Sequence, residues 1–400
     1  MSTIDIVGID CFGCLCCEAV CPMDAISQYK DEEGFIYPRI NKHKCVECGK
    51  CTKVCACLGD ASRNACISSY AAKVTDAKSI KNSSSGGISY AILERAIEKG
   101  WVVYACVFDD NLKCKHARIS SISDLALTRG SKYVQSELSG IYAALKDDLN
   151  RGQAVVFVGT PCQVAAIRKY CSDADYLLTI DIVCHGVPSQ ALFEAFLRDI
   201  SERNGARVED VMFRDKDKGW NTIGSLVLSR GRSSKKQYFS PHDEIYYRAF
   251  IDGMIYRESC YKCQYSTTKR PGDITLGDFW GVKDMHPEID SKNGVSLVMC
   301  NSPRGVDFFA SLEGVTKVES SLDRISASNP NLNHPTNRPL QRNLLAKEML
   351  ANYNEVQIAF LKDKRRLIKK WTMFIRKSIA VVARKIAPSL VRKIRIQRKI

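Results

Sequence analysis

The stretches CFGCLCCEAVCP (11–22) and CVECGKCTKVC (45–55) decide the fold of the amino-terminal part of this chain. Each holds four cysteines at the same spacing, with two residues between the first three and three residues before the fourth. Three thiolates on one tight turn can bind three irons of a cubane cluster, and the fourth then points toward a second cluster. The repeated spacing therefore predicts a pair of iron–sulfur clusters.

This spacing is the one that bacterial two-cluster ferredoxins use. We expect two 4Fe–4S clusters, one held by Cys11, Cys14, Cys17 and Cys55, and the other by Cys45, Cys48, Cys51 and Cys21. Zinc and disulfides are the alternatives, but structural zinc sites use two well-separated pairs of ligands. One departure is that Ala56 and Cys57 follow Cys55, where proline is usual. Cys16 and Cys57 fall outside the spacing, and we interpret them as bystanders.

The composition is that of a globular protein in a reducing compartment. Hydrophobic residues make up 45% of the 400 residues and charged residues 26%, which excludes collagen-like and largely disordered chains. The opening MSTIDIVGID lacks the basic and apolar regions of a secretory signal. We therefore expect a cytoplasmic protein, and the large number of cysteines, 19 in all, points to metal or redox chemistry.

The net charge of +15 is concentrated at the carboxyl end, because residues 362–400 hold fifteen Lys and Arg and one Asp. The rest is nearly neutral, which argues against a nucleic-acid-binding body. Apolar residues of this tail recur at helical spacing, with basic residues opposite them: Leu367, Trp371, Phe374, Ile375, Ile379 and Val382. A basic amphipathic helix favours peripheral contact with an anionic membrane at the inner face of the cell membrane. A partner-docking helix and a nucleic-acid tail are the alternatives.

Secondary-structure patterns change after residue 60. Before it, AISQYK (25–30) and FIYPRI (35–40) flank DEEG, which predicts a β-hairpin. Beyond it, we expect helices over 88–100, 139–152, 160–170 and 188–200, and strands over 101–108, 154–159 and 176–184. This alternation predicts a mainly parallel sheet. Strands over 208–215, 225–230 and 236–240 follow more closely, which favours an α+β arrangement there. The common dinucleotide fingerprint G-x-G-x-x-G is absent.

Four further cysteines lie at chemically suggestive places. Cys162 in GTPCQ (159–163) and Cys184 in VCHGVPS (183–189) each follow a predicted strand. The carboxyl ends of neighbouring parallel strands meet at the edge where ligands bind. Cys260 and Cys263 form a CxxC motif, which is redox-active, half of a metal site or a chance pair. Together the four supply the number of ligands that a cubane cluster needs.

Seven motifs in this order resemble the family of coenzyme F-420 hydrogenase/dehydrogenase beta subunits, in its version with an amino-terminal two-cluster ferredoxin domain. They are SSSGG (83–87), GTPCQ (159–163), CHGVPS (184–189), FRDKDKGW (213–220), CYKC (260–263), DITLGDFWG (273–281) and GVSLVMCNS (294–302). The resemblance covers residues 1 to about 345. It implies an FAD-containing iron–sulfur protein that passes electrons between ferredoxin-type clusters and an organic acceptor. In archaeal members this acceptor is coenzyme F-420, and some bacterial relatives occur in polysaccharide gene clusters.

The resemblance carries site residues with it. A third 4Fe–4S cluster is expected on Cys162, Cys184, Cys260 and Cys263; the alternative is inert thiols, as we interpret Cys66, Cys106, Cys114, Cys171 and Cys300. Residues expected to bind the flavin are Lys81, Ser84, Ser85, Gly86, Gly87, Gly159, Thr160, Pro161, Gln163 and Arg270. The alternatives are helix N-capping by Ser84 or Ser85, a tight strand–helix turn at 159–163, and solvated charges at Lys81 and Arg270.

Other polar residues of the motifs are weaker candidates. His185 follows an expected ligand and is the candidate proton donor to reduced flavin or substrate; a hydrogen-bonded loop residue is the alternative. Residues expected to shape the site are Asp273, Asp278 and Trp280, and candidates for an anion contact are Arg214, Lys216 and Trp220. Packing is the alternative for Trp280, and a surface loop is the alternative for the last three.

The sequence therefore predicts four parts in a mixed α+β and α/β fold. These are a two-cluster ferredoxin domain (1–60), a larger α/β flavin iron–sulfur domain in two portions (61–150 and 151–345), and a basic helical tail (346–400). The expected function is that of an iron–sulfur flavoprotein oxidoreductase that works with a ferredoxin or another redox partner. The alternatives are a non-catalytic subunit that delivers electrons to a separate enzyme, and a membrane-associated accessory protein without flavin.

Overall fold

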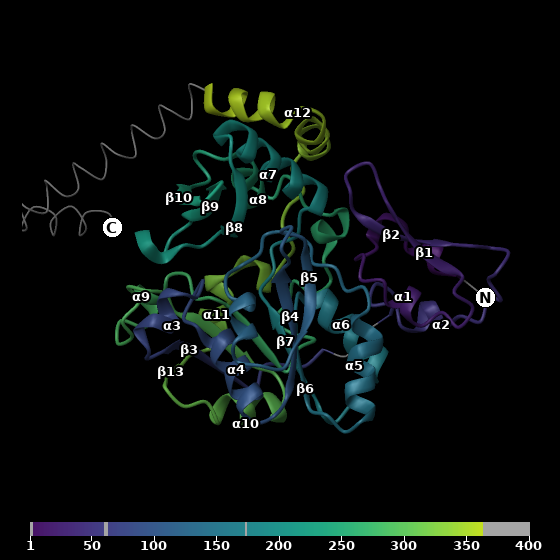
Figure 1. Ribbon diagram of the computed structural model, residues 1–400. Helices are drawn as coiled ribbons and strands as arrows, with labels where there is room; N and C mark the ends of the chain where they lie inside the picture. Colours follow the sequence, from purple (N-terminus) through teal and green to yellow (C-terminus); the bar gives the residue numbers. More distant parts are fainter. Residues whose placement is uncertain (1–2, 60–62, 173, 363–400) are drawn as a thin grey trace, which may run out of the picture. The chain divides into compact units, whose positions relative to one another are not determined.

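The computed structural model describes residues 3–59, 63–172 and 174–362. It divides into a compact unit, Met1–Tyr353, and a second unit, Asn354–Ile400 (Figure 1). Helix α12 (Arg342–Lys362) spans the division and has a non-helical residue, Asn352, inside it. The predicted amphipathic segment lies outside the described residues, apart from Lys362. Among the helices that are described, none is long and apolar enough to cross a membrane.

The amino-terminal segment contains the predicted hairpin. Its elements are η1 (Ile4–Asp10), α1 (Cys16–Ala19), β1 (Ile26–Lys30), β2 (Ile36–Ile40) and α2 (Lys50–Lys53). Strands β1 and β2 pair antiparallel, with Ile26 opposite Ile40, so the hairpin prediction is confirmed. The turn is closed by Asp31, whose Oδ1 accepts hydrogen bonds from the backbone N–H of Glu33 and Phe35 at 3.0 and 2.8 Å.

An eight-stranded mixed sheet forms the centre of the main unit, in the order β13-β3-β12-β11-β7-β6-β4-β5. Its strands are β3 (Ser68–Val74), β4 (Val102–Phe108), β5 (Cys114–Ile119), β6 (Val155–Gly159), β7 (Leu177–Ile182), β11 (Ile274–Asp278), β12 (Ser296–Cys300) and β13 (Val315–Glu319). Strands β4, β6, β7 and β11 pair in parallel, which confirms the parallel core predicted from the alternation. The other pairs are antiparallel.

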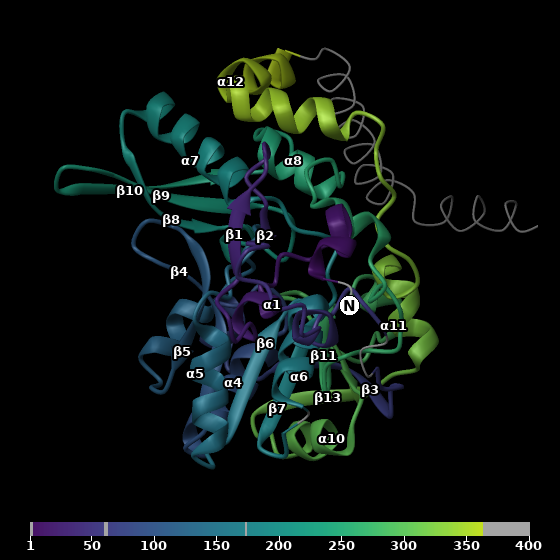
Figure 2. The same cartoon turned by 90° about the vertical axis from the view of Figure 1, so that its right-hand side faces the viewer.

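Helices cover both faces of this sheet, because its central strands are apolar on both sides. They are α3 (Ala77–Lys81), α4 (Ile88–Glu98), α5 (Ile141–Asn150), α6 (Pro161–Cys171), α9 (Val282–Met285), α10 (Pro303–Ala310) and α11 (Leu322–Ser328). Ile92 of α4 and Phe308 of α10 pack with Val156 in one core cluster. Leu145 of α5 and Val164 of α6 pack with Phe157 in another cluster. Figure 2 shows α5 and α6 beside β6.

A smaller antiparallel sheet holds the strands β8 (Arg207–Met212), β9 (Gly224–Arg230) and β10 (Ser233–Phe239). Helices α7 (Gln190–Asn204) and α8 (Ile245–Ile251) pack on it through aromatic side chains. Phe196 stacks on Tyr246 with ring centroids 5.2 Å apart and also contacts Phe239. The chain therefore has the predicted mixed α+β and α/β fold, whereas the domain boundaries given above stay predictions.

Candidate redox site

The first expected set of cluster ligands is gathered in the amino-terminal segment. Cys11, Cys17 and Cys55 are buried in one core cluster. The Cys14 thiol lies close enough to Cys11 and Cys55 for electrostatic interaction with their thiolates. Burial, with repulsion from these neighbours, raises the pKa of Cys14 to about 12. Four such thiolates repel one another, so they fit a site for a cationic iron core that displaces their protons.

The backbone of both cysteine stretches carries the same strain. Gly13 and Leu15 have φ of 67° and 60°, and Glu47 and Gly49, at the equivalent positions, have φ of 51° and 73°. Leucine and glutamate rarely adopt this left-handed conformation, which costs on the order of 1–3 kcal/mol and is retained mainly at functional sites. The two stretches therefore repeat one backbone geometry, as their repeated cysteine spacing predicts.

The second expected set lines one small cavity. Cys21, Cys45, Cys48 and Cys51 surround it, together with the apolar side chains of Ile26 and Ile40. Across residues 3–59, 63–172 and 174–362, no three Cys, His, Asp or Glu side chains converge tightly enough for a single metal ion. A four-iron cluster is a larger body whose thiolates surround a space, and the second set surrounds such a space.

The two bystander cysteines lie close to the first set. The thiol of Cys57 hydrogen-bonds to Cys11 and Cys55, and this contact lowers the pKa of both of these thiols. Sequence reasoning missed this contact, although the unusual residue after Cys55 marks the position. Cys16 is fully buried, and its Sγ lies 3.8 Å from the carbonyl oxygen of Ala166, which is a packing role.

A cavity of about 350 Å³ opens at the carboxyl ends of β6, β7 and β11, where the parallel strands were expected to form a site. All four cysteines of the expected third set line it. Cys162 is the second residue of α6, Cys184 follows β7, Cys260 lies in η4 (Glu258–Lys262) and Cys263 comes directly after η4. Burial, with repulsion from Cys263, raises the pKa of Cys162 and of Cys260 to about 12. Thiolates placed this close repel one another, so these thiols, like those of the first set, fit a site for a cationic iron core.

The first and third sets adjoin each other. Cys14 is close enough to Cys162 for their charges to interact. Phe12, Cys14, Cys162 and Cys263 pack against one apolar cluster that includes Tyr265, and the rings of Phe12 and Tyr265 have centroids 5.8 Å apart. The Tyr265 hydroxyl donates a hydrogen bond of 2.9 Å to the carbonyl oxygen of Ala56, next to Cys55. Two cluster sites so arranged would be separated only by packed side chains.

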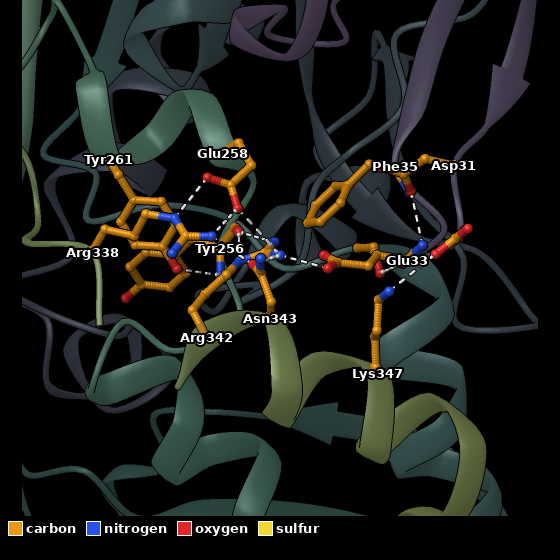
Figure 3. A network of polar contacts seen from close by, with 12 residues as sticks. Asp31, Glu33, Phe35, Tyr256, Glu258, Tyr261, Arg338, Arg342, Asn343 and Lys347 are labelled. Carbon is orange, nitrogen blue, oxygen red and sulfur yellow. Dashed lines mark hydrogen bonds and ion pairs between the residues drawn. The ribbon is translucent and has the colours of Figure 1, made fainter. Parts of the chain in front are cut away.

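Two buried arginines fix the amino-terminal segment against the cavity. Arg257 donates to the carbonyl oxygens of Cys11 and Ile36 at 2.6 and 2.8 Å, and its guanidinium lies over the Tyr37 ring. Arg342 pairs with Glu33 of the hairpin turn at 2.5 Å and donates to the carbonyl oxygen of Tyr256 (Figure 3). Both arginines are almost fully buried. They connect the hairpin directly to the segment that carries Cys260.

Most of the residues expected to bind flavin line this cavity: Ser84, Ser85, Gly87, Gly159, Thr160, Pro161, Gln163 and Arg270. Gly86 lies behind the lining, where a Cβ would clash with the carbonyl oxygen of Ala72. Lys81 is exposed and pairs with Asp217 at 3.1 Å. The cavity therefore gathers the two loops that the motifs singled out.

Arg270 has no donor left for a phosphate. Its five N–H groups are directed to Asp181 (twice), Tyr265 O, Thr267 O and Ile182 O. The ion pair with Asp181 is 2.6 Å long, and both side chains are at most 1% exposed. Arg270 therefore has a structural role at the cavity floor. Its saturated hydrogen bonds argue against the expected phosphate contact, and its burial argues against a solvated charge.

The N-capping alternative for the SSSGG loop is wrong. Helix α4 begins after Gly87, which has φ 84°, and no side chain caps it. The Ser84 hydroxyl instead accepts from the backbone N–H of Ser131 at 2.8 Å, and the Ser85 hydroxyl donates to Val295 O at 2.9 Å. These serines fix the loop to its neighbours, and the first turn of α4 is left facing the cavity.

Of the remaining candidates, His185, Asp278 and Trp280 line the cavity and Asp273 does not. The side chain of His185 lines the cavity, and its carbonyl oxygen accepts from Thr336 at 2.8 Å. Trp280 lines the cavity and stacks on Trp220 with ring centroids 5.0 Å apart. Asp278 accepts from both Arg214 and Trp220 at 2.8 and 3.3 Å. Asp273 instead accepts hydrogen bonds from the backbone N–H and the hydroxyl of Thr179 at 2.8 and 2.7 Å, so it ties β11 to β7 and does not line the cavity.

The surface-loop alternative is wrong for Arg214 and Lys216. Both side chains are buried, at 4% and 9% exposure. Lys216 Nζ donates to the carbonyl oxygens of Ile80 and Ser85, and burial lowers its pKa to about 8. The FRDKDKGW motif therefore supports the SSSGG loop from behind, while Trp220 is half-buried against Trp280.

Sequence reasoning missed one whole wall of the cavity. The segment 128–136 supplies Arg129, Lys132, Tyr133 and Gln135, and β5 supplies His116. Arg129 lies over the Tyr90 ring at 4.0 Å. The segment matches no motif, and its one signal is that two basic residues and a tyrosine lie within three residues of Gly130.

Two family models match this chain, and both describe the coenzyme F420 hydrogenase/dehydrogenase beta subunit. The family model for the amino-terminal part of that subunit matches residues 69–142, and the model for its carboxyl-terminal part matches residues 152–322. The F subunit of the F(420)H(2) dehydrogenase of Methanosarcina mazei is 27% identical over 187 residues, which are 44% of this chain and 53% of that relative. The chain thus matches about half of that relative's length. A chain of the F420-reducing [NiFe] hydrogenase complex from Methanosarcina barkeri aligns with a TM-score of 0.45 at 17% identity, over 75% of this chain and 94% of that one.

Proposed function

The chain belongs to the family of coenzyme F420 hydrogenase/dehydrogenase beta subunits, and from that premise we propose that it is an iron–sulfur electron-transfer subunit of a larger redox enzyme. Its M. mazei relative is itself named as a subunit of a dehydrogenase. This favours the delivery of electrons to or from a partner protein over a free-standing reductase. The proposed ligands are the cysteines of the three sets described above.

One observation carries the proposal. The expected ligands of the third cluster line the same cavity as the SSSGG and GTPCQ loops, and Cys162 of that set also adjoins Cys14 of the first set. Electrons that enter at the amino-terminal clusters therefore have a short route, through packed side chains around Tyr265, to the cavity. The chain would supply the positions and surroundings of its cofactors, which supply the redox chemistry.

Within this proposal, the cavity binds FAD. Gly87 and Gly159 line the cavity, the first turn of α4 favours an anion, and Arg129 and Lys132 add positive charge. A bound flavin would supply the exchange between single electrons from clusters and electron pairs on an organic molecule. His185 on the cavity wall would move a proton, and the stacked Trp280 would limit the space for the acceptor. Coenzyme F420 is the proposed acceptor, and a role in polysaccharide synthesis stays a prediction.

The test is the cofactor content of the full chain after anaerobic purification. Wild-type protein should carry roughly twelve irons with equal sulfide, from three four-iron clusters, and one flavin. Cys162→Ser should lose about four irons and one cluster signal in electron paramagnetic resonance, while the amino-terminal clusters remain.

Cys171→Ser is the matched control, because Cys171 lies at the opposite end of the same helix, α6, outside the expected ligand sets. It should keep every cofactor. Zinc without sulfide, or an unchanged iron content in Cys162→Ser, would refute the assignment of the clusters. Iron without flavin would refute the flavin alone and leave the electron-transfer role.

A further inference from the structure

A pair of thiols that the expected clusters do not use lies in the cavity wall. Cys106 of β4 and Cys114 of β5 have their sulfur atoms 3.2 Å apart. Cys106 lines the cavity, whereas Cys114 is buried at 1% exposure behind it. No sequence pattern indicates this contact, which the interpretation of both thiols as inert did not foresee.

The register of the hairpin explains the approach. Strand β4 pairs with β5 so that Cys106 is opposite His116 and Phe108 is opposite Cys114. The two cysteines are therefore diagonal neighbours on one face of the sheet. A disulfide has an S–S bond of about 2.05 Å, so the sulfurs have about 1 Å to close. The side chains of diagonal neighbours are normally farther apart than those of directly opposed residues. Here the two cysteine side chains are oriented so that their sulfur atoms approach to 3.2 Å.

The surroundings favour thiol chemistry at Cys106. A hydrogen bond with Cys114 and the charge of Lys132, another residue of the cavity wall, lower the pKa of the Cys106 thiol against the effect of burial. The thiolate is the attacking species in disulfide exchange. An accessible thiol of this kind, with a second thiol behind it, matches the arrangement of an attacking and a resolving cysteine.

We propose that Cys106 and Cys114 form a reversible disulfide in the wall of the redox cavity. The inference rests on the proposed function for its reductant, the reduced flavin. The S–S bond accepts two electrons and two protons and breaks into two thiols, as the reduced flavin gives up two electrons and returns to its oxidised form. In the reverse direction the two thiols would give two electrons and two protons to the oxidised flavin as the S–S bond forms. The pair would store an electron pair beside the flavin.

The test reads the disulfide directly in the full chain. Anaerobically purified protein is equilibrated in buffers of reduced and oxidised dithiothreitol, quenched in acid, alkylated and digested with trypsin. Cleavage after Lys99, Lys113 and Lys115 separates the two cysteines onto peptides 100–113 and 114–115. The expected result is a linked peptide, two hydrogens lighter than the sum of its parts, that increases with the oxidised fraction and disappears on reduction.

Variants define what the linkage means. Cys106→Ser and Cys114→Ser should each abolish the linked peptide and keep the wild-type iron content, and Cys171→Ser should change neither. Two singly alkylated peptides at every buffer ratio would overturn the proposal, and so would loss of iron in Cys106→Ser. A chain loaded with reduced flavin should lose the linkage faster than the flavin-free chain, and equal rates would overturn the assigned reductant. If the chain forms the disulfide but binds no flavin, the assignment of FAD in the proposed function fails and the disulfide itself stands.

Discussion

His116 is a residue of the cavity wall whose burial changes the pKa of its side chain. Its side chain is 4% exposed, its Nε2 lies 2.8 Å from the carbonyl oxygen of Val158, and its ring stacks on Phe157 at 5.0 Å. Burial lowers the pKa of His116 to about 4, and the nearby Lys132 adds to the shift. The folded protein therefore holds this imidazole neutral at pH values where an unfolded chain would protonate it.

This shift predicts a pH dependence of stability. Because the folded pKa is below the unfolded value of about 6.5, the unfolded state binds more protons between these values. The free energy of unfolding should therefore fall as the pH drops from about 6.5 toward 4, by up to roughly 3 kcal/mol for this group. Anaerobic denaturant titrations from pH 7 to pH 5 should show a smaller slope for His116→Gln than for wild type. His242→Gln, at an exposed site, is the control, and equal slopes in all three proteins would contradict this account.

At the scale of elements, the sequence predicted the helices and strands that follow one another directly along the chain. The alternation of apolar and helical segments indicated β6, α6 and β7, because each follows the last along the chain. It could not indicate that β3 pairs with β12 and β13, since these partners lie far along the chain and their pairing has no local signal. In the site, fixed cysteine spacings predicted the two amino-terminal sets of cluster ligands, and the family resemblance added the third set, whose four cysteines line one cavity. Neither the Asp181 partner of Arg270 nor the cavity wall of segment 128–136 could be found, because tertiary contacts alone define them.

Helix α6 shows how one element positions a site residue. Its first turn carries Cys162, and Gln163 beside it is buried. The Gln163 Oε1 accepts from the backbone N–H of Thr160 at 3.1 Å, and its Nε2 donates to the Ser136 hydroxyl at 2.9 Å. The side chain thus ties the start of the helix to the opposite cavity wall. Cys162 is held between these two anchors.

Removing this tie should loosen the helix start. Gln163→Leu keeps the approximate volume but leaves the Thr160 N–H and the Ser136 hydroxyl without their partner, which should cost about 1–3 kcal/mol of unfolding free energy. We expect a lower thermal midpoint and a third cluster that is lost more readily on exposure to a chelator. Gln237→Leu, on the edge strand β10, should change stability by less than about 0.5 kcal/mol. Equal losses in the two variants would show that Gln163 has no special role.

At the scale of the whole molecule, buried arginines join the amino-terminal segment to the segment that carries Cys260. Arg342 lies between Glu33 of the hairpin and Glu258, whereas Arg338 pairs with the same Glu258 from a more exposed position (Figure 3). The side chain of Arg342 is 2% exposed and that of Arg338 is 36% exposed. Because a buried charge without its partner is costly, the two pairs should differ sharply in energy.

Arg342→Ala should therefore destabilise the protein far more than Arg338→Ala. We expect a loss of about 3 kcal/mol or more for Arg342→Ala, because Glu33 is left partly buried without a partner. For Arg338→Ala we expect about 0–1 kcal/mol. Limited proteolysis should release the segment before residue 60 first in Arg342→Ala. Equal stability of the two variants would mean that this network does not hold the segment.

The most direct test of the central claim follows electrons through the molecule. Stopped-flow absorbance should record bleaching of the bound flavin when the full chain is mixed anaerobically with a reduced ferredoxin. We predict fast bleaching in wild type and in Cys171→Ser, and strong slowing in both Cys14→Ser and Cys162→Ser, because each removes a ligand of one of the two adjoining clusters. Bleaching at the wild-type rate in all four proteins would contradict a route from the amino-terminal clusters through the third cluster to the cavity.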